Sequence, residues 1–174
     1  MIKVGVVGLG MMGTTHLDVY SKHPGVEVIA VADVDPDVLR GRKTAAGNVK
    51  GQAAGGFDLA KVRQYDEGLK LIADPDVQLV DVCLWTPLHR QYAKAALAAG
   101  KHVLCEKPMC RTAREAADLA AAADQARGYY MTAMCMRFWP GWDWLKRAIA
   151  KKTYGKCLAA HFRRVTSPIR KPFY

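Results

Sequence analysis

A glycine-rich turn near the start of the chain has the residue types and spacing that bind a diphosphate. The sequence GLGMMG at residues 8–13 follows a short apolar run and opens a helical stretch, which fits the pattern G-x-G-x-x-G. The first glycine permits a tight turn, the second lets the backbone approach a pyrophosphate, and the third lets helix and strand pack closely. The helix then presents free amides and the positive end of its dipole to the phosphates. The alternative is a strand-to-helix turn that binds no ligand. The cofactor contacts predicted in this motif are Gly8, Gly10, Met11, Met12 and Gly13.

Asp33 distinguishes between the two nicotinamide cofactors. It lies 20 residues beyond Gly13, at the end of the second predicted strand. A carboxylate there accepts hydrogen bonds from both ribose hydroxyls of the adenosine half and repels the 2′-phosphate of NADP. We therefore predict NAD as the cofactor, with NADP less favoured. Two alternatives stay open: Arg40, Arg42 or Lys43 folds back to bind such a phosphate, or Asp33 serves as a helix N-cap.

Polar residues also follow the fourth and fifth predicted strands, at the edge where open parallel sheets bind ligands. Thr86 and His89 follow the fourth strand, and His89 is equally compatible with a ligand-binding role and with local packing at a helix start. Glu106 and Lys107 follow the fifth strand. The Lys107 ammonium is suited to hydrogen-bond a substrate hydroxyl or carbonyl and to stabilise developing negative charge. The alternative for Lys107 is a surface side chain in a turn.

The elements expected around these residues alternate between strand and helix. Apolar runs predict strands at residues 2–7, 26–32, 62–65, 79–84, 102–105 and 129–135, with an alternating strand at 156–166. Helices are predicted at residues 12–21, from Asp35-Pro36, at 66–73 with Asp66 as the cap, at 88–99, at 112–127 with a Thr112–Glu115 capping box, and at 139–150. Residues 41–56 are expected to form a longer connection. This order predicts the α/β class, with a Rossmann doubly wound parallel sheet.

The formal net charge of +10 is unevenly distributed along the 174 residues. Residues 1–125 hold 15 basic and 15 acidic side chains, whereas residues 126–174 hold 11 basic side chains and one acid. A basic segment of this kind fits nucleic acid, an anionic ligand or an acidic partner surface. Its aromatic side chains would suit base stacking, but Trp139, Trp142 and Leu145 also fit the buried face of an amphipathic helix. We favour the buried face and predict no nucleic-acid partner.

Composition argues against several other classes of protein. No apolar run approaches the roughly 20 residues that cross a bilayer, and glycines interrupt any signal peptide at the N-terminus. We therefore predict no membrane partner and expect a cytoplasmic protein. The five cysteines include no C-x-x-C pair, and their odd number argues against a disulfide framework. Three of them follow apolar strand-like stretches, which fits small buried thiols in a reducing compartment, and we expect no metal site.

Taken together, these motifs resemble the Gfo/Idh/MocA oxidoreductases, which include glucose–fructose oxidoreductase and inositol dehydrogenase. The resemblance rests on the glycine motif, Asp33, VCLWTPLH at 82–89, AGKHVLCEKP at 99–108 and MRFWP at 136–140. It implies NAD(P)-dependent hydride transfer at a secondary alcohol of a small-molecule sugar, polyol or related compound. Lys107 matches the lysine of the family's E-K-P motif, which implies catalytic contact with substrate and nicotinamide. Trp85 replaces a proline often found in relatives, and it is expected to narrow the cleft. The cofactor-binding residues predicted beyond the glycine motif are Asp33, Leu84, Thr86, His89, Glu106, Lys107 and Arg137.

The resemblance also implies a second domain. Residues 1–125 are expected to form the NAD(P)-binding Rossmann domain. Residues 126–174 are expected to hold the last Rossmann strand and the incomplete start of a truncated α/β C-terminal domain, since relatives are about twice as long. The family's catalytic histidine has no counterpart, because His161 lies within a predicted strand. We therefore expect NAD(H) binding with poor turnover, and either homo-oligomers formed through an unpaired strand edge or a mobile C-terminus. The alternative is a non-catalytic dinucleotide-binding or regulatory module.

Overall fold

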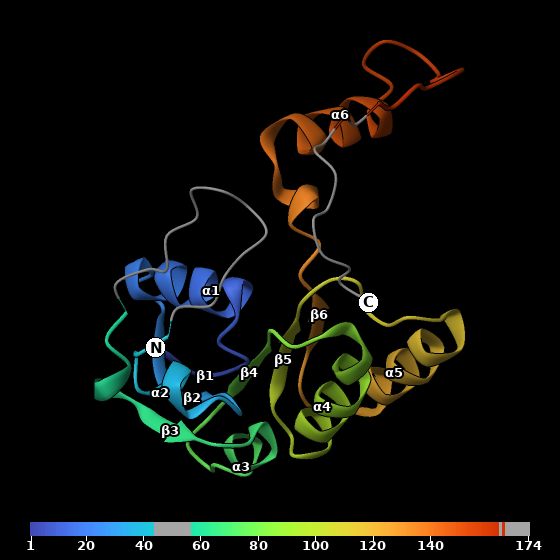
Figure 1. Ribbon diagram of the computed structural model, residues 1–174. Coiled ribbons are helices and arrows are strands. Elements are labelled where there is room, and N and C mark those ends of the chain that lie inside the picture. The colour runs from blue at the N-terminus through green and yellow to red at the C-terminus, as the bar shows by residue number, and fades with distance from the viewer. Residues whose placement is uncertain (44–56, 164, 166–174) are drawn as a thin grey trace. The chain divides into compact units, whose positions relative to one another are not determined.

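The computed structural model describes residues 1–43, 57–163 and 165, whose helices and strands are shown in Figure 1. These residues divide into two compact units, of which the first ends at Ala133 and the second begins at Met134. Residues 44–56 of the predicted connection lie outside the described residues. Among the described helices, none has the length and apolar character needed to span a membrane.

The first unit is built on a single six-stranded sheet in which all neighbouring strands are parallel. The strand order is β3-β2-β1-β4-β5-β6, so the chain winds outward from the centre in one direction and then in the other. This order confirms the predicted Rossmann doubly wound sheet. The strands are β1 (Ile2–Val7), β2 (Val26–Ala32), β3 (Arg63–Tyr65), β4 (Leu79–Val82), β5 (His102–Cys105) and β6 (Tyr130–Thr132).

Helices connect these strands, and two of them begin with the caps that the sequence predicts. The Asp35 carboxylate accepts the amide of Asp37 at 3.0 Å, and the Thr112 hydroxyl accepts the amide of Glu115 at 3.2 Å. Each cap satisfies an amide of the first helical turn, which has no partner inside the helix. The helical elements are α1 (Met11–Lys22), α2 (Pro36–Leu39), the 3₁₀ helix η1 (Leu59–Lys61), α3 (Gly68–Ile72), α4 (Thr86–Ala98) and α5 (Ala113–Gln125).

Two apolar clusters hold the helices against the two faces of the sheet. Val4 and Val6 of β1 pack with Leu17 of α1 and with α2, whereas Val7 packs with α3, α4 and α5 residues in the other cluster. This division follows from the strand, because successive side chains point to opposite faces. Figure 1 shows α1 apart from α3 and α4 across the sheet. The helices therefore fix the carboxyl ends of the strands, where the predicted site residues lie.

Several predicted boundaries in this unit differ from the structure by one to three residues. Glu67, not Asp66, is the N-cap of α3, because the Asp66 carboxylate instead binds the Lys70 ammonium at 2.8 Å. Helix α4 begins at Thr86, two residues earlier than predicted, since Pro87 is tolerated in a first helical turn. Strand β6 ends at Thr132 because only its first residues pair with β5.

The second unit holds the 3₁₀ helix η2 (Cys135–Phe138) and α6 (Pro140–Ala150). The prediction that Trp139 and Trp142 form a buried face with Leu145 is wrong, since Trp139 is 48% exposed and Trp142 is 37% exposed. An amphipathic helix buries its apolar stripe only against a partner element. In the described part of this unit, α6 is instead accompanied by Phe162, whose ring centroid lies 5.4 Å from that of Trp142.

The strand predicted at 156–166 is absent from its described residues, 156–163 and 165. These residues are exposed, and Leu158 retains 88% of its accessible surface. Alternating polarity is compatible with a strand, but a strand also needs a neighbour to accept and donate its backbone hydrogen bonds. The described part of the second unit contains no such neighbour.

All five cysteines are free thiols, and their burial depends on the unit in which they lie. Cys105 is buried, and Cys83 and Cys110 are half-buried in the first unit. Cys135 and Cys157 are exposed, which contradicts the expectation of a buried thiol for Cys135, the member of this pair that ends a predicted strand. The difference follows from packing, because the described residues of the second unit supply no buried core.

Candidate cofactor site

The centre of the sheet, where the strand order reverses, brings two site segments together. Strands β1 and β4 are neighbours there, and the amide of Cys83 donates to the carbonyl of Val7 at 2.8 Å. The glycine loop follows β1, and the turn that holds Leu84 and Thr86 follows β4. In open α/β sheets ligands bind outside the carboxyl ends of the strands at this reversal point. The fold therefore places both predicted segments at the same edge of the sheet.

The three glycines of the loop meet three different surroundings. Gly8 has a φ of +91°, and a Cβ there would lie 2.6 Å from the carbonyl oxygen of Cys83. A Cβ on Gly13 would overlap the carbonyl oxygen of Gly8. A Cβ on Gly10, in contrast, would meet nothing within 4 Å. Gly8 and Gly13 are thus required by the fold, whereas Gly10 leaves open space that a diphosphate fits.

Helix α1 points its uncapped N-terminus into that space. Gly10 is the N-cap and supplies no side-chain acceptor for the amides of the first turn. Met11 and Met12 carry two of these amides, and both residues are half-buried. The positive end of the helix and its free N–H groups together favour an anion. The loop therefore fits a dinucleotide diphosphate.

Asp33 lies at the end of β2 and is hydrogen-bonded to the glycine loop. Its Oδ2 accepts the amide of Leu9 at 2.7 Å, and its Oδ1 accepts the amide of Asp35 at 2.9 Å. The N-cap of α2 is Asp35, so the alternative of Asp33 as that cap is wrong. Of the cations proposed to bind a 2′-phosphate, Lys43 pairs with Asp35 at 2.6 Å and Arg42 pairs with Asp37 at 4.0 Å.

The turn after β4 contributes residues of two kinds. Leu84 and Thr86 are half-buried at the start of α4, and Trp85 is 66% exposed. His89 is buried, and its ring nitrogens lie 2.8 Å from the carbonyl oxygens of Leu84 and Pro108. This geometry favours the local-packing alternative for His89, since the ring links the turns after β4 and β5.

In the turn after β5, the first two residues of the E-K-P motif differ in burial. Glu106 is buried, and its carboxylate accepts the backbone amide of Lys107 at 3.0 Å. The Lys107 side chain is exposed, as a group that contacts a ligand must be. Arg137 lies in η2 of the second unit, and its contact with the site stays a prediction.

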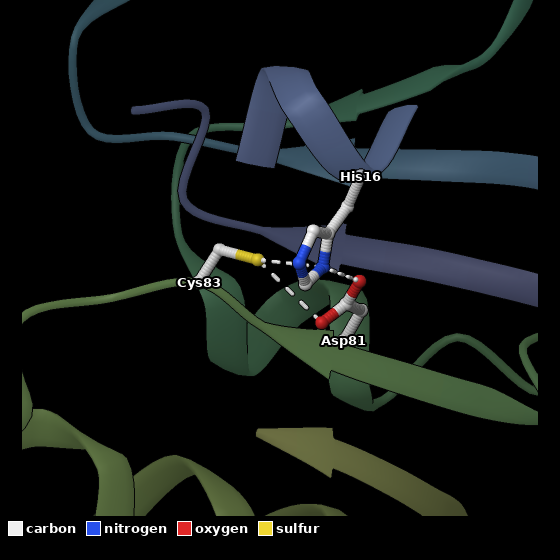
Figure 2. Close-up of side chains that lie close together, drawn as sticks. All are labelled: His16, Asp81 and Cys83. Atoms are coloured by element: carbon white, nitrogen blue, oxygen red, sulfur yellow. Dashed lines mark hydrogen bonds and ion pairs between the residues drawn. The ribbon is translucent and has the colours of Figure 1, made fainter. Parts of the chain in front are cut away.

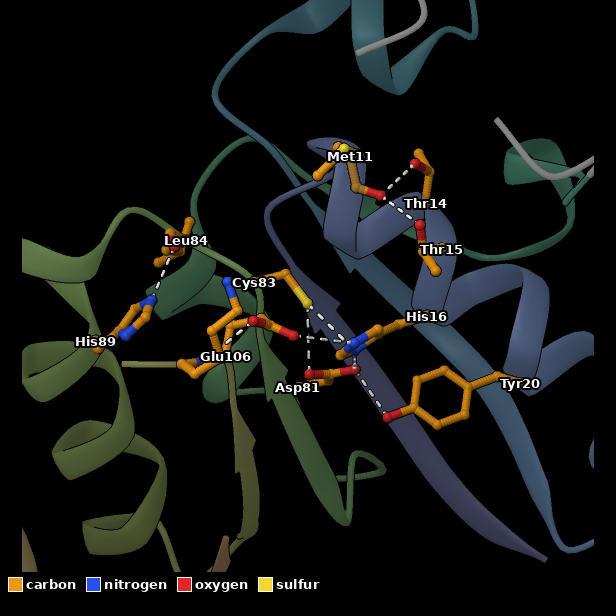
Figure 3. A network of polar contacts seen from close by, with 11 residues as sticks. Met11, Thr14, Thr15, His16, Tyr20, Asp81, Cys83, Leu84, His89 and Glu106 are labelled. Atoms are coloured by element: carbon orange, nitrogen blue, oxygen red, sulfur yellow. Dashed lines mark hydrogen bonds and ion pairs between the residues drawn. The ribbon is translucent and has the colours of Figure 1, made fainter. Parts of the chain in front are cut away.

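A buried polar network, not predicted from the sequence, lies beneath these turns (Figures 2 and 3). His16 of α1 lies 2.7 Å from the Asp81 carboxylate through Nδ1 and 3.3 Å from the Glu106 carboxylate through Nε2. The Tyr20 hydroxyl donates to Asp81 at 2.8 Å, and the Cys83 thiol donates to Asp81 at 3.5 Å. Asp81 has no exposed surface at all. An aspartate inside the apolar strand LVDV was the available sign that such a partner was needed.

This network stabilises the charged forms of His16 and Glu106. Burial alone would lower the pKa of His16, but hydrogen bonds with Asp81, Cys83 and Glu106 outweigh it and raise that pKa to about 12. Burial would raise the pKa of Glu106, yet His16 and the Lys107 amide keep it below its ordinary value. Burial and the Asp81 charge raise the pKa of the Cys83 thiol to about 12. His16 is therefore an imidazolium between two carboxylates at neutral pH.

The ligand atoms of His16, Asp81 and Cys83 lie within 4.8 Å of one another, which raises the question of a metal ion. The imidazole nitrogen and the Asp81 oxygen are 2.7 Å apart, the distance of a charge-assisted hydrogen bond. Two such atoms on one tetrahedral zinc ion would be separated by about 3.3 Å. We therefore interpret the cluster as a hydrogen-bonded network.

A doubly wound sheet with an open glycine loop at its reversal point and a carboxylate after β2 defines a dinucleotide-binding Rossmann domain. Residues 2–134 match the Gfo/Idh/MocA family, described as "Oxidoreductase family, NAD-binding Rossmann fold". The chain belongs to this family, which confirms the resemblance and the predicted NAD cofactor class.

Individual relatives agree with this assignment. Inositol 2-dehydrogenase from Pseudomonas syringae pv. syringae (strain B728a) is 36% identical over 162 residues, which cover 92% of this chain and 45% of that protein. Inositol 2-dehydrogenase from Paracoccus denitrificans (strain Pd 1222) is 31% identical over 162 residues, covering 92% and 44%. The chain thus spans less than half the length of these relatives.

Solved structures show the same fold. A probable dehydrogenase from Thermotoga maritima superposes with a TM-score of 0.76 at 29% identity, over 88% of this chain and 42% of that one. Scyllo-inositol dehydrogenase from Lactobacillus casei, solved with NAD(H) and scyllo-inositol, gives a TM-score of 0.75 at 23% identity, over 89% and 42%. The second likeness concerns the fold alone.

Proposed function

We propose that this chain binds NAD(H) and forms the cofactor half of an oxidoreductase that acts on a secondary alcohol of a sugar or polyol. The observation that carries the proposal is the glycine loop at the reversal point, where Gly10 faces open space and Asp33 is bonded to the loop. Relatives named inositol 2-dehydrogenase support a polyol as the substrate class. A cytoplasmic location and homo-oligomers stay predictions.

Each candidate residue has a distinct part in this proposal. Gly10 and the first-turn amides of α1 hold the diphosphate, and the Asp33 carboxylate accepts the hydroxyls of the adenosine ribose. Bound NAD supplies a hydride acceptor. The exposed Lys107 ammonium donates a hydrogen bond to the substrate oxygen and stabilises the negative charge that develops there as the hydroxyl proton passes to solvent water. Leu84 and Thr86, half-buried at the start of α4, contact the bound cofactor.

The role of Asp33 predicts a preference between two cofactors. Wild-type protein should bind NAD⁺ more tightly than NADP⁺, and Asp33→Asn should weaken NAD⁺ binding by about 10- to 100-fold, the usual value of hydrogen bonds to a charged group. Isothermal titration with both dinucleotides measures this. Asp37→Asn is a matched control, because Asp37 is an exposed acid of α2 outside the loop contacts. Equal affinity of the wild type for NAD⁺ and NADP⁺ would contradict the assignment of Asp33.

The role of Lys107 predicts a separation between binding and turnover. Lys107→Met should lower NADH formation with inositol by about 100-fold, since it removes the group that stabilises the developing negative charge, and this loss should exceed any loss of NAD⁺ affinity. Absorbance at 340 nm follows the reaction, and titration follows binding. Wild-type protein that binds NAD⁺ but forms no NADH with any polyol would instead favour the non-catalytic binding module.

A further inference from the structure

His16 connects two parts of the site that come from opposite halves of the sheet. It lies on α1, whose first turn follows the glycine loop, and its ring reaches Asp81 in β4 and Glu106 at the end of β5. Figure 3 shows the ring of His16 between α1 and these two carboxylates. A single side chain therefore joins the phosphate-binding helix to the strands that carry the nicotinamide end of the predicted site.

The contacts of His16 with Asp81 and Glu106 are strong because both carboxylates are buried. Asp81 is fully buried and Glu106 is 6% exposed, so both carboxylates need a partner in place of water. Asp81 also accepts the Tyr20 hydroxyl and the Cys83 thiol, whereas the side-chain contact of Glu106 is with His16. The other oxygen of Glu106 accepts the Lys107 amide at 3.0 Å. The His16 ring therefore fixes the Glu106 carboxylate, and that carboxylate in turn fixes the backbone amide of Lys107.

We infer that His16 is a positioning residue that holds the Glu106–Lys107 turn in fixed register with the phosphate-binding end of α1, so that both halves of one dinucleotide are gripped together. The inference rests on the proposed function, since it concerns the same cofactor. Asp33 and the loop do not depend on His16, because the Leu9 amide binds Asp33 and the Gly8 amide binds the carbonyl of Ala32. Loss of His16 should therefore disturb the nicotinamide end and spare the adenosine end.

Two ligands separate these ends experimentally. NADH needs both, whereas ADP-ribose has the adenosine and the diphosphate but no nicotinamide ring. His16→Gln should weaken NADH binding by about tenfold or more, as misplacement of a positioning group does, and should change ADP-ribose binding by less than about twofold. A purely structural role for His16 would weaken both ligands equally. Isothermal titration of the full chain measures both affinities.

A second variant guards against a failure to fold. His16→Gln alone leaves two buried carboxylates without a cation, so His16→Gln/Asp81→Asn restores the net charge of the cluster while the ion pair with Glu106 stays lost. Tyr20→Phe is the matched control, because it removes a hydrogen bond to Asp81 without touching Glu106. It should leave the ratio of the two affinities unchanged.

Different results of these titrations bear on the role of His16 and on NAD(H) binding itself. A selective loss of NADH affinity in the double variant supports the inference. Unchanged NADH affinity, or an equal loss for both ligands, overturns it while NAD(H) binding stands. Failure of the wild-type chain to bind either ligand overturns the proposed function, and the inference with it.

Discussion

Replacement of Gly10 by valine should abolish measurable NAD(H) binding while the domain stays folded. A Cβ at this position meets no protein atom within 4 Å, and the backbone φ of −65° suits any residue. The new side chain would instead occupy the space that we assign to the diphosphate, and we expect a loss of at least about 100-fold in affinity, or 2.7 kcal/mol. Isothermal titration with NADH, together with urea unfolding, measures both expectations.

Two other glycines provide the controls for this experiment. Gly141→Val also enters open space, but in the second unit, and should leave NADH affinity unchanged. Gly13→Val should destabilise the fold itself, because its Cβ overlaps the Gly8 carbonyl. If Gly10→Val bound NADH as tightly as the wild type, the loop would not be the diphosphate site.

The buried imidazolium should make the stability of the protein depend on pH in a defined window. The folded-state pKa of His16 is raised from 6.5 to about 12, so its contribution is fully present below pH 6.5 and is lost as the pH rises toward 12. Each pH unit should therefore lower the free energy of unfolding, by about 1.0 kcal/mol for the first unit above 6.5 and by about 1.4 kcal/mol for the units that follow. Urea unfolding at pH 6.5, 7.5 and 8.5 measures this change, which should total roughly 2.3 kcal/mol because the unfolded-state histidine is half protonated at pH 6.5.

The choice of window isolates His16 from its neighbours. The raised pKa values of Cys83 and Tyr20 lower stability only above about pH 9, where these groups ionise in the unfolded chain. The lowered pKa of Glu106 acts on the acid side. His16→Gln/Asp81→Asn should lose the slope that the wild type shows between pH 6.5 and 8.5. Equal slopes in the two proteins would show that His16 is not held as a cation.

The features that could be predicted from the sequence are those in which the local backbone accepts only certain residue types. Gly8 and Gly13 occupy positions where any side chain would collide with a carbonyl oxygen, so their spacing alone marks the loop. The Thr112 and Asp35 caps could also be predicted, because each side chain binds a backbone amide only a few residues further along the chain. The order of strands and helices then restricts the topology, because parallel crossovers are right-handed.

The features that escaped prediction depend on partners distant in sequence. The contact of His16 with Asp81 spans 65 residues and depends on which face of α1 meets which strand. The apolar pattern of residues 79–82 predicts a buried strand but does not identify the partner of Asp81 within it. Residues 156–163 show the converse case. Their alternating pattern suits a strand, but the described second unit offers no strand to pair with.

The amide spectrum of ¹⁵N-labelled protein during titration with NADH reports where the dinucleotide binds. The largest shifts should fall on the amides of Leu9, Gly10, Met11 and Met12, since these line the open end of α1, with further shifts near Asp33 and Lys107. Shifts confined to other regions, or an unchanged spectrum at saturating NADH, would contradict a dinucleotide site at the centre of the sheet.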